Sequence, residues 1–472
     1  MHLWPASPRD SSKSVKAGRM YVRRDSLTPL PIYSCYAVTV GITAQEYHER
    51  RAKLAASLPE NGIAILPSAD LKYRSGAVFY QFHQESNFLY LTGFLEPESI
   101  AIIQKVGAGN SDEYIFHLLV REKDTKAEQW EGARSGTQAA IDVFNADQSG
   151  NVKEVSSLLP PLIAQASGGV FTDATGDVRT AFGKFFAGTQ PSDGFVSLLR
   201  DADVRSLRPV INDLKVLKSP AEIANMRHAG KISGRAYAAA MSQSWPDEQR
   251  LASFLDYSFQ QNGCSGSAYV PVVAGGKNAN CIHYVRNDME MPKDEIVLVD
   301  AGAEYGHYIT DITRSWPING EFSAAQKDLY EVVLNAQRAS VSLCREDSGL
   351  SLDKVHSATE KALRQGLKDI GFDIQGNEMD ILFPHHVGHY IGMDVHDTPG
   401  YPRNRPLKAG MCVTVEPGIY VPDDNRFPSH FRNMGIRIED SIAVEQTTPH
   451  ILTTEAPKEV ADIEEMGKAH KG

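Results

Sequence analysis

Histidines are concentrated in one short stretch of the sequence, "PHHVGHYIGMDVHD" at residues 384–397. Four of the chain's 15 histidines lie in it, namely His385, His386, His389 and His396. Imidazoles at this density can bind a metal ion, transfer protons, hold a substrate or simply pack. The histidines alone leave these alternatives open, so the acidic residues elsewhere in the chain carry the argument further.

Two aspartates lie in the stretch "EIVLVDAGAEYGHYITDITRSWPI", which reads as a β-hairpin. Strand-like runs flank Tyr305-Gly306, where a glycine can supply the positive φ of a tight turn. With that turn, Asp300 and Asp311 face each other across the ladder, with Cβ atoms about 4.5–5.5 Å apart. Facing carboxylates repel each other unless a cation lies between them. An exposed edge hairpin is the alternative, but the apolar neighbours favour a covered sheet and a metal site.

Two glutamates follow β-branched, apolar runs later in the chain. Glu416 ends such a run in "MCVTVEPGIYV", and Glu439 lies in "MGIRIEDSIAV" two residues after Arg437. We expect the Arg437 and Glu439 side chains to point to one face of a strand. Either glutamate alone could lie on a surface strand. With His389, however, the four acids suit a pair of divalent ions, Mn²⁺, Co²⁺, Zn²⁺ or Mg²⁺.

The elements that must position these residues form two predicted domains. Residues 43–207 begin with a capping box, Thr43 to Glu46, and continue with four short apolar runs. These runs ("GIAILP", "NFLYLTGF", "SIAIIQKV", "EYIFHLLV") alternate with helix-like stretches, which predicts a smaller α/β domain. Residues 1–42 carry more basic than acidic side chains and several serines. They have the composition of an import presequence, with a disordered tail as the alternative.

The second predicted domain, residues 208–472, contains two related helix starts. Ser219 with Glu222 forms one capping box, and Ser323 with Gln326 forms the other. A second helix-like segment and then strands follow each start. The region is therefore expected to consist of two α-α-β halves of about 100 residues each, a duplication of architecture.

The totals of the sequence restrict the classes of protein to consider. A length of 472 residues favours two domains, and 42% hydrophobic with 23% charged residues is typical of a globular protein. The formal charge of −11 argues against nucleic acid or an anionic membrane as partner. No apolar run approaches the roughly 18 residues of a membrane span. The five scattered cysteines favour a reducing compartment and exclude a thiolate zinc finger.

The five candidate ligands resemble, in order and in local motif, the dinuclear metal set of the pita-bread metallopeptidases. That family includes aminopeptidase P, prolidase and methionine aminopeptidase. The stretches "VDAGAEYGHYITDITRSWPINGEF", "HHVGHYIGMDVHD", "VTVEPGIY" and "GIRIED" look like aminopeptidase P. In the smaller domain, "FHQESNFLYLTGFLEPES" extends the resemblance, which covers about residues 40–450. Within the family the chain looks most like the mitochondrial branch, which includes intermediate-cleaving peptidases that trim imported proteins.

This resemblance implies an N-terminal α/β domain followed by a pita-bread domain of duplicated α-α-β units. It implies an aminopeptidase that removes one N-terminal residue from peptides or proteins, either before proline or as a bulky residue on mitochondrial processing intermediates. Two cations about 3.5 Å apart would activate a water for attack on the first peptide bond. Mn²⁺ is the expected metal, with Co²⁺ or Zn²⁺ as alternatives. A homodimer in the mitochondrial matrix is implied, with the cytoplasm or nucleus as alternative locations.

The resemblance also implies a role for each metal ligand. Glu439 would bridge the two ions together with Asp311, and Asp300 would bind one of them. Of the four clustered histidines, His389 would be the metal ligand. Glu416 would be both a ligand and the proton shuttle. His389 and Glu439 are further expected to contact the substrate.

Four other residues match positions around the family's active site. His385 would line the site, and His396 would contact the substrate and stabilise the tetrahedral intermediate. His283, in "CIHYVRND", matches a further active-site histidine that also contacts substrate. Tyr269 matches a residue of the substrate pocket. Arg437 is expected to keep the Glu439 carboxylate ionised, or else to form a structural ion pair.

Two positions stand apart from the family pattern. His386 matches no functional position, so we expect it to pack or to lie on the surface. Leu89 replaces a tryptophan that in some relatives reaches a neighbouring subunit's site, so strict selection of Xaa-Pro is not expected. The rival functions are prolidase, which needs a clamp for the substrate carboxylate, methionine aminopeptidase, which needs no such first domain, and a non-enzymatic peptide-binding module, which would lack the ligands.

Overall fold

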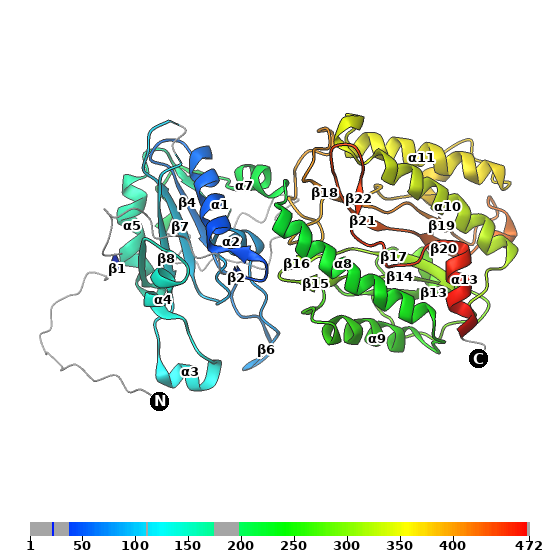
Figure 1. Cartoon of the computed structure of the whole chain (residues 1–472), viewed down its shortest axis with the longest axis horizontal. Helices are drawn as coiled ribbons and strands as arrows, with labels where there is room; N and C mark the ends of the chain where they lie inside the picture. The colour runs from blue at the N-terminus through cyan, green and yellow to red at the C-terminus, as the bar shows by residue number, and fades with distance from the viewer. Residues whose placement is uncertain (1–20, 23–36, 110–111, 174–197, 470–472) are drawn as a thin grey trace, which may run out of the picture. The chain divides into compact units, whose positions relative to one another are not determined.

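The computed structural model describes residues 21–22, 37–109, 112–173 and 198–469 (Figure 1). These residues form two compact units, which we call unit 1 (residues 1–35 and 44–208) and unit 2 (residues 36–43 and 209–472). Most of the predicted presequence or tail, residues 1–42, lies outside the described residues. Among the described residues, no helix is both long enough and apolar enough to cross a membrane.

Unit 1 is built on a mixed seven-stranded sheet with the strand order β1-β9-β8-β7-β4-β10-β11. The central strands β4, β7 and β8 pair antiparallel, whereas β9, β10 and β11 add parallel pairs. The strands are β1 (Tyr21–Val22), β4 (Ile63–Pro67), β7 (Ile100–Lys105), β8 (Tyr114–Val120), β9 (Gln148–Asn151), β10 (Val170–Phe171) and β11 (Val204–Arg205), with a separate hairpin of β5 (Tyr73–Ser75) and β6 (Val78–Phe79). The helices are α1 (Ala44–Ser57), α2 (Ser86–Thr92), α3 (Thr125–Glu131), α4 (Gly136–Asp142) and α5 (Val155–Gln165).

Three of the four apolar runs in unit 1 are strands, β4, β7 and β8, but the run "NFLYLTGF" forms helix α2. The helix begins because the Glu85 carboxylate accepts a hydrogen bond from Phe88 N at 2.6 Å. It ends at Gly93, which adopts the left-handed conformation with φ 69°. Leu89 lies within α2 and is only 2% exposed. The expectation about Xaa-Pro selection that was drawn from Leu89 stays a prediction.

Unit 2 contains two pairs of long helices, as the duplicated pattern predicts. The first pair is α8 (Pro220–Met241) and α9 (Glu248–Gln261), and the second is α10 (Ala324–Leu343) and α11 (Leu352–Asp369). Both predicted capping boxes are present, Ser219 with Glu222 and Ser323 with Gln326. Figure 1 shows the strands of unit 2 lying between the two helix pairs. The pita-bread fold expected from the resemblance is thus confirmed.

The strands of unit 2 form small antiparallel sheets, ordered β13-β14-β17, β12-β15-β16, β18-β21-β22, β19-β20 and β2-β3. Helices α8 and α9 pack on the strands of the first half, and α10 packs on those of the second half. The strands are β2 (Ala37–Thr39), β3 (Ile42–Thr43), β12 (Gly266–Ser267), β13 (Val272–Gly275), β14 (Ile296–Asp300), β15 (Ala303–Tyr305), β16 (Tyr308–Ile309), β17 (Thr313–Pro317), β18 (Cys412–Val415), β19 (Gly418–Val421), β20 (Met434–Arg437), β21 (Asp440–Ala443) and β22 (His450–Ile451). Shorter helices complete it: α7 (Arg208–Lys215), α12 (Glu378–Leu382) and α13 (Val460–Lys468).

The hairpin that carries the two aspartates has a different register from the predicted one. Its turn lies at Gly306 and His307, with φ values of 58° and 66°, the positive pair that a two-residue type I′ turn requires. Tyr305 therefore pairs with Tyr308, and Asp300 pairs with Thr313 rather than with Asp311. The predicted register was wrong because it placed the turn at Tyr305-Gly306, although a histidine can adopt the left-handed conformation.

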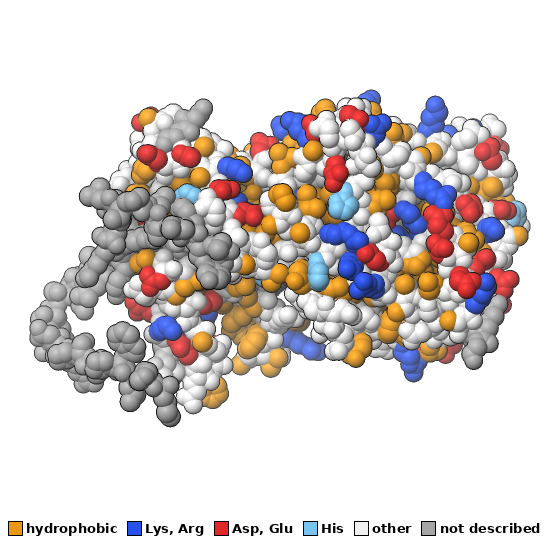
Figure 2. Space-filling model, in the orientation of Figure 1, with side chains coloured by type: hydrophobic (Ala, Val, Ile, Leu, Met, Phe, Trp, Pro, Cys, Tyr) orange, Lys and Arg blue, Asp and Glu red, His pale blue; other side chains and the backbone are white. Residues whose placement is uncertain are grey.

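Acidic and basic side chains are interspersed on the face of unit 2 shown in Figure 2. The interior of unit 2 contains one large apolar cluster, contributed by its long helices and by strands from both halves, and a smaller one around Leu298 and Tyr420. The strand ends beside this core are where the candidate ligands lie, so their positions are set by buried and tightly packed backbone.

Candidate metal centre

The five candidate ligands come from separate elements of unit 2. Asp300 ends β14, and Asp311 lies between β16 and β17. Glu416 directly follows β18, and Glu439 lies between β20 and β21. His389 lies in an irregular segment that runs along β18, where Thr414 N donates to His389 O at 2.9 Å.

A close backbone approach fixes the segment that carries His389. A Cβ atom on the preceding Gly388 would lie 2.0 Å from Thr414 O, so only glycine fits there. The Thr414 hydroxyl also accepts a hydrogen bond from His389 N at 3.1 Å. Glu416 N, on the same strand end, donates to Val387 O at 2.7 Å. His389 and Glu416 are thereby held side by side.

The side chains of these residues converge on one spot. Ligand atoms of Asp311, His389 and Glu439 all lie within 4.8 Å of one another. His389 Nε2 is 3.5 Å from Asp311 Oδ2 and 3.6 Å from Glu416 Oε1. The Tyr269 hydroxyl lies 2.7 Å from Asp300 Oδ1 and 2.5 Å from Asp311 Oδ1, which joins Asp300 to the cluster.

Two features of this cluster fit a bound cation. Glu439 is only 1% exposed, and its buried Oε1 has no hydrogen-bond partner. His389 Nδ1 lies 3.1 Å from Tyr390 O, a contact that leaves Nε2 facing the carboxylates. Buried acceptors with nothing to accept from are costly unless a cation or proton joins them. Oxygen and imidazole donors suit divalent ions of intermediate hardness.

The pKa values of the acids express the same crowding of negative charge. Burial and the charge of Asp311 raise the pKa of Asp300 to about 7. Burial also raises the pKa of Glu416, and burial with the neighbouring carboxylates raises the pKa of Glu439 well above its ordinary value. Burial opposes ionisation of Asp311 as well, but hydrogen bonds from His389 and Tyr269 outweigh it and lower its pKa. Without a cation, the cluster therefore retains protons.

The histidines around the acids differ in their preferred charge. Burial lowers the pKa of His389, but its contact with Asp311 and the charge of Glu416 outweigh burial and raise it. Burial and the charge of Arg437 lower the pKa of His385 to about 3. Burial and the charge of His389 lower the pKa of His396 to about 4. At neutral pH His385 and His396 are therefore uncharged imidazoles.

Arg437 is buried among these groups, and its direct carboxylate partner is Asp300. Its Nη2 lies 2.6 Å from Asp300 Oδ2, and its Nη1 donates to the Tyr420 hydroxyl at 2.8 Å. It reaches Glu439 through Thr313. Burial and the neighbouring carboxylates raise the pKa of Glu439, and the charge of Arg437 opposes them, as expected for this arginine. Both Arg437 and Glu439 do contact the same Thr313 hydroxyl, which agrees with their expected common face.

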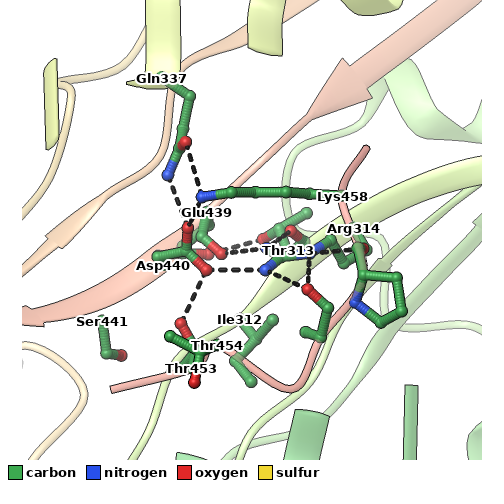
Figure 3. Close-up of polar contacts among 12 residues, drawn as sticks. Ile312, Thr313, Arg314, Gln337, Glu439, Asp440, Ser441, Thr453, Thr454 and Lys458 are labelled. Carbon is green, nitrogen blue, oxygen red and sulfur yellow. Dashed lines mark hydrogen bonds and ion pairs between the residues drawn. The ribbon is translucent and has the colours of Figure 1, made fainter. Parts of the chain in front are cut away.

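A second buried network holds the backbone behind Glu439 (Figure 3). Arg314 donates to Glu439 O and, at 2.7 Å, to Asp440 Oδ1. Asp440 Oδ2 accepts from Gln337 Nε2 at 2.8 Å and from Lys458 Nζ at 2.5 Å. The Asp440 carboxylate is thus paired with the charges of Arg314 and Lys458. This network anchors the strand end from which the Glu439 side chain projects.

The remaining predicted site residues lie around the acids. His385 Nε2 is 2.9 Å from the Tyr420 hydroxyl, and the rings of His396 and His389 have centroids 4.4 Å apart. Burial is the main cause of the lowered pKa values of His385 and His396, and the charge of His283 adds a smaller contribution to both. His386, for which no functional role was predicted, stacks on His356 with centroids 4.5 Å apart, which agrees with the expected packing role.

Sequence reasoning missed two side chains of the site, Thr313 and Tyr420. Each has a local signal: Thr313 lies two residues after Asp311, and Tyr420 lies two residues after Gly418. A Cβ atom on Gly418 would lie 2.8 Å from the Tyr420 hydroxyl, so that glycine makes room for the tyrosine. Neither signal identifies the partner across the sheet, which only the fold brings close.

Comparisons with known proteins agree with this geometry. The sequence profile "Metallopeptidase family M24" matches residues 224–446, and "Aminopeptidase P, N-terminal domain" matches residues 47–171. Intermediate cleaving peptidase 55 of Saccharomyces cerevisiae is 42% identical over 436 residues, which cover 91% of this chain and 85% of the yeast protein. Xaa-Pro aminopeptidase 3 of Mus musculus is 39% identical, with 91% and 87% covered. The crystal structure of yeast Icp55 bound to the inhibitor apstatin superposes with a TM-score of 0.79 at 39% identity, covering 92% of this chain and 100% of that one.

Proposed function

The chain belongs to metallopeptidase family M24, in its aminopeptidase P branch, and on this premise we propose that the acid–histidine cluster of unit 2 is the catalytic centre. The protein is a metallo-aminopeptidase that removes one residue from the N-terminus of peptides or proteins. It depends on divalent metal ions. The observation that carries the proposal for the site is the unpartnered Glu439 Oε1 beside His389 Nε2 and Asp311.

We assign five residues as metal ligands: Asp300, Asp311, His389, Glu416 and Glu439. Ions bound there would supply Lewis acidity and a water of lowered pKa. The residues around them decide the charge state of the ligands. Arg437 balances the charge of Asp300 through an ion pair, with 2.6 Å between Arg437 Nη2 and Asp300 Oδ2. Two ions are proposed because four carboxylates in one buried site exceed the charge that a single divalent ion balances.

Three histidines line the substrate side in this proposal. His396, beside His389, donates a hydrogen bond to the oxyanion that forms when the peptide carbonyl is attacked. His283 and His385 contact the substrate around the scissile bond. Their pKa values suit this role, since burial keeps His385 and His396 uncharged at neutral pH. A neutral imidazole can donate one hydrogen bond without attracting a competing anion.

Glu416 is the proposed proton shuttle. Its carboxylate lies at the edge of the cluster, 3.6 Å from His389 Nε2 and 4.0 Å from His385 Nδ1. Burial raises its pKa, so it can accept a proton from the attacking water and return it to the departing amine. Tyr269, whose hydroxyl contacts both aspartates, is proposed to hold those carboxylates in place and to border the substrate pocket.

Three finer statements belong to the same proposal. Mn²⁺ is proposed as the metal because a mainly oxygen-based site suits it. A homodimer is proposed, supported by the β5–β6 hairpin of unit 1, where Tyr73 and Phe79 are 56% and 59% exposed. The mitochondrial matrix is proposed as the location, supported by the basic composition of residues 1–42 and by similarity to intermediate cleaving peptidases.

The test combines a substrate panel with a ligand variant. The purified protein, loaded with Mn²⁺, is offered Ala-Pro, Xaa-Pro-Xaa tripeptides and longer peptides that begin with Tyr, Leu or Phe. Release of a single N-terminal residue from the tripeptides or the longer peptides is expected, with inhibition by apstatin. Asp311→Ala should abolish both metal binding, measured by elemental analysis, and turnover, while circular dichroism stays unchanged. Turnover by Asp311→Ala would refute the site, and cleavage of Ala-Pro alone would indicate a dipeptidase.

A further inference from the structure

Glu248 is a buried carboxylate that none of the steps above uses. It lies in the first turn of α9 and is 0% exposed. Its Oε1 accepts hydrogen bonds from Gly275 N and Asn278 Nδ2, both at 2.9 Å. Its Oε2 accepts from the Tyr284 hydroxyl at 2.9 Å and from Met289 N at 3.0 Å. All four acceptor positions of the carboxylate are therefore filled by uncharged donors.

Two of these donors belong to the segment that carries His283. Residues 281–289 form neither helix nor strand, and none of them is buried. Apart from Ile282 and Tyr284, which pack against a neighbouring apolar cluster, a segment of this kind has little packing to fix its conformation. Glu248 contacts it at Tyr284 and at Met289, and so ties both halves of the segment to α9. The same carboxylate also holds Gly275, at the end of β13.

The neighbours of His283 are both turned towards the interior. Ile282 and Tyr284 pack against a buried apolar cluster that includes Leu298 of β14 and Tyr420. His283 itself is exposed, and its charge acts on His385 and His396. The bond from the Tyr284 hydroxyl to Glu248 thus fixes the residue next to His283, on the side of the segment opposite the exposed imidazole.

Asn287 provides a second anchor for residues 281–289, so this segment does not depend on Glu248 alone for its attachment. Asn287 Oδ1 accepts from Val273 N at 2.9 Å, and its Nδ2 donates to Pro271 O at 2.7 Å. These bonds tie the far half of the segment to β13, and they remain when Glu248 is changed. Loss of the Glu248 bonds would therefore loosen the half that contains His283 and leave the segment attached to the sheet.

We propose that Glu248 is a positioning residue for the aminopeptidase reaction, which holds His283 at the catalytic centre through the Tyr284 hydroxyl. The inference rests on the proposed substrate contact of His283. It predicts that the effect of Glu248 on catalysis passes through His283, and that metal binding is independent of Glu248, because no metal ligand lies among its four partners.

A double-mutant cycle separates this role from a general structural one. Glu248→Gln and Tyr284→Phe are each made alone and together with His283→Ala, and kcat/KM is measured with a tripeptide substrate. Glu248→Gln should lower kcat/KM by about tenfold or more and Tyr284→Phe by about threefold, while His283→Ala lowers it by about a hundredfold. On the His283→Ala background, both changes should alter kcat/KM by less than about twofold. The metal content per chain should stay at the wild-type value in Tyr284→Phe.

The control is Tyr257→Phe, which removes a hydroxyl from the same helix at a position that is 61% exposed and should leave kcat/KM unchanged. If Glu248→Gln does not fold, Tyr284→Phe carries the cycle alone. Losses that multiply with that of His283→Ala, or wild-type activity of Tyr284→Phe, would overturn the inference and leave the proposed role of His283 intact. Full activity of His283→Ala would overturn both.

Discussion

The Thr313 hydroxyl lies between Arg437 and Glu439 and determines how Glu439 is presented. It accepts a hydrogen bond from Arg437 Nε at 3.0 Å and donates one to Glu439 Oε2 at 2.6 Å. Because this bond satisfies Oε2, the other carboxylate oxygen is the one left without a partner beside His389 and Asp311. A single buried hydroxyl thus connects the arginine to a proposed metal ligand.

Thr313→Val should weaken metal binding without unfolding the protein. Valine has nearly the same volume but leaves Arg437 Nε and Glu439 Oε2 unpaired. Changes of such supporting groups typically lower metal affinity by about 10–100-fold. Metal titration with elemental analysis measures the effect. Thr359→Val, a buried threonine of α11, is the matched control and should keep wild-type affinity. Equal affinities of Thr313→Val and wild type would contradict the role given to this hydroxyl.

Metal binding should release protons and strengthen as pH rises. In the metal-free protein Asp300 has a pKa of about 7, and the pKa values of Glu416 and Glu439 are also raised. Metal competes with these protons, so affinity is low where the acids are protonated and increases as pH rises through their pKa values. Metal uptake in weakly buffered solution, followed with a pH indicator between about pH 5 and pH 8, measures the release. Uptake that is independent of pH over this range would contradict the assignment.

Gly388→Ala should disturb His389 through the backbone. The added Cβ atom would lie 2.0 Å from Thr414 O, so the two segments must separate. We expect a loss of stability of about 1–3 kcal/mol and a lower metal content. Thermal unfolding and elemental analysis report the two effects. Gly376→Ala is the control, since its Cβ would have no neighbour nearer than 3.4 Å. A stable, fully metallated Gly388→Ala protein would show that the close approach is not needed.

Asp440→Ala should be one of the most destabilising single changes in unit 2. It leaves Arg314 buried without its carboxylate and removes the partner of Lys458. Loss of one member of a buried ion pair costs about 3–5 kcal/mol. Asp347→Ala breaks an exposed pair with Arg345 and should cost less than about 1 kcal/mol. Denaturant unfolding of both variants measures the difference, and similar losses would argue against the network of Figure 3 as an anchor.

The fold of unit 2 was largely predictable because its signals are local. The capping boxes at Ser219 and Ser323 mark the starts of α8 and α10, and both are present in the structure. The run that became α2 shows the limit of such signals. Its apolar residues are compatible with a strand or a helix. The Glu85 cap at its start and the left-handed conformation of Gly93 at its end favour the helix.

The site shows a similar division. The sequence identified which acids and histidines belong together, because each lies in a recognisable local motif. It could not identify the partners of Arg437, which turned out to be Asp300 and Tyr420. Those contacts join β14, β19 and β20, whose relative register no local pattern encodes.

By itself, then, the sequence determined the kinds of donor atoms at the site and the elements that present them, since residue type, capping and turn chemistry act over a few neighbouring positions. Only the tertiary structure determined that Arg437 and Glu439 share the Thr313 hydroxyl and that one oxygen of Glu439 has no hydrogen-bond partner. It also determined that Glu248 anchors the segment that carries His283. These depend on distances between residues separated by 36 to 126 positions in the chain, which packing of the core alone brings to hydrogen-bond length.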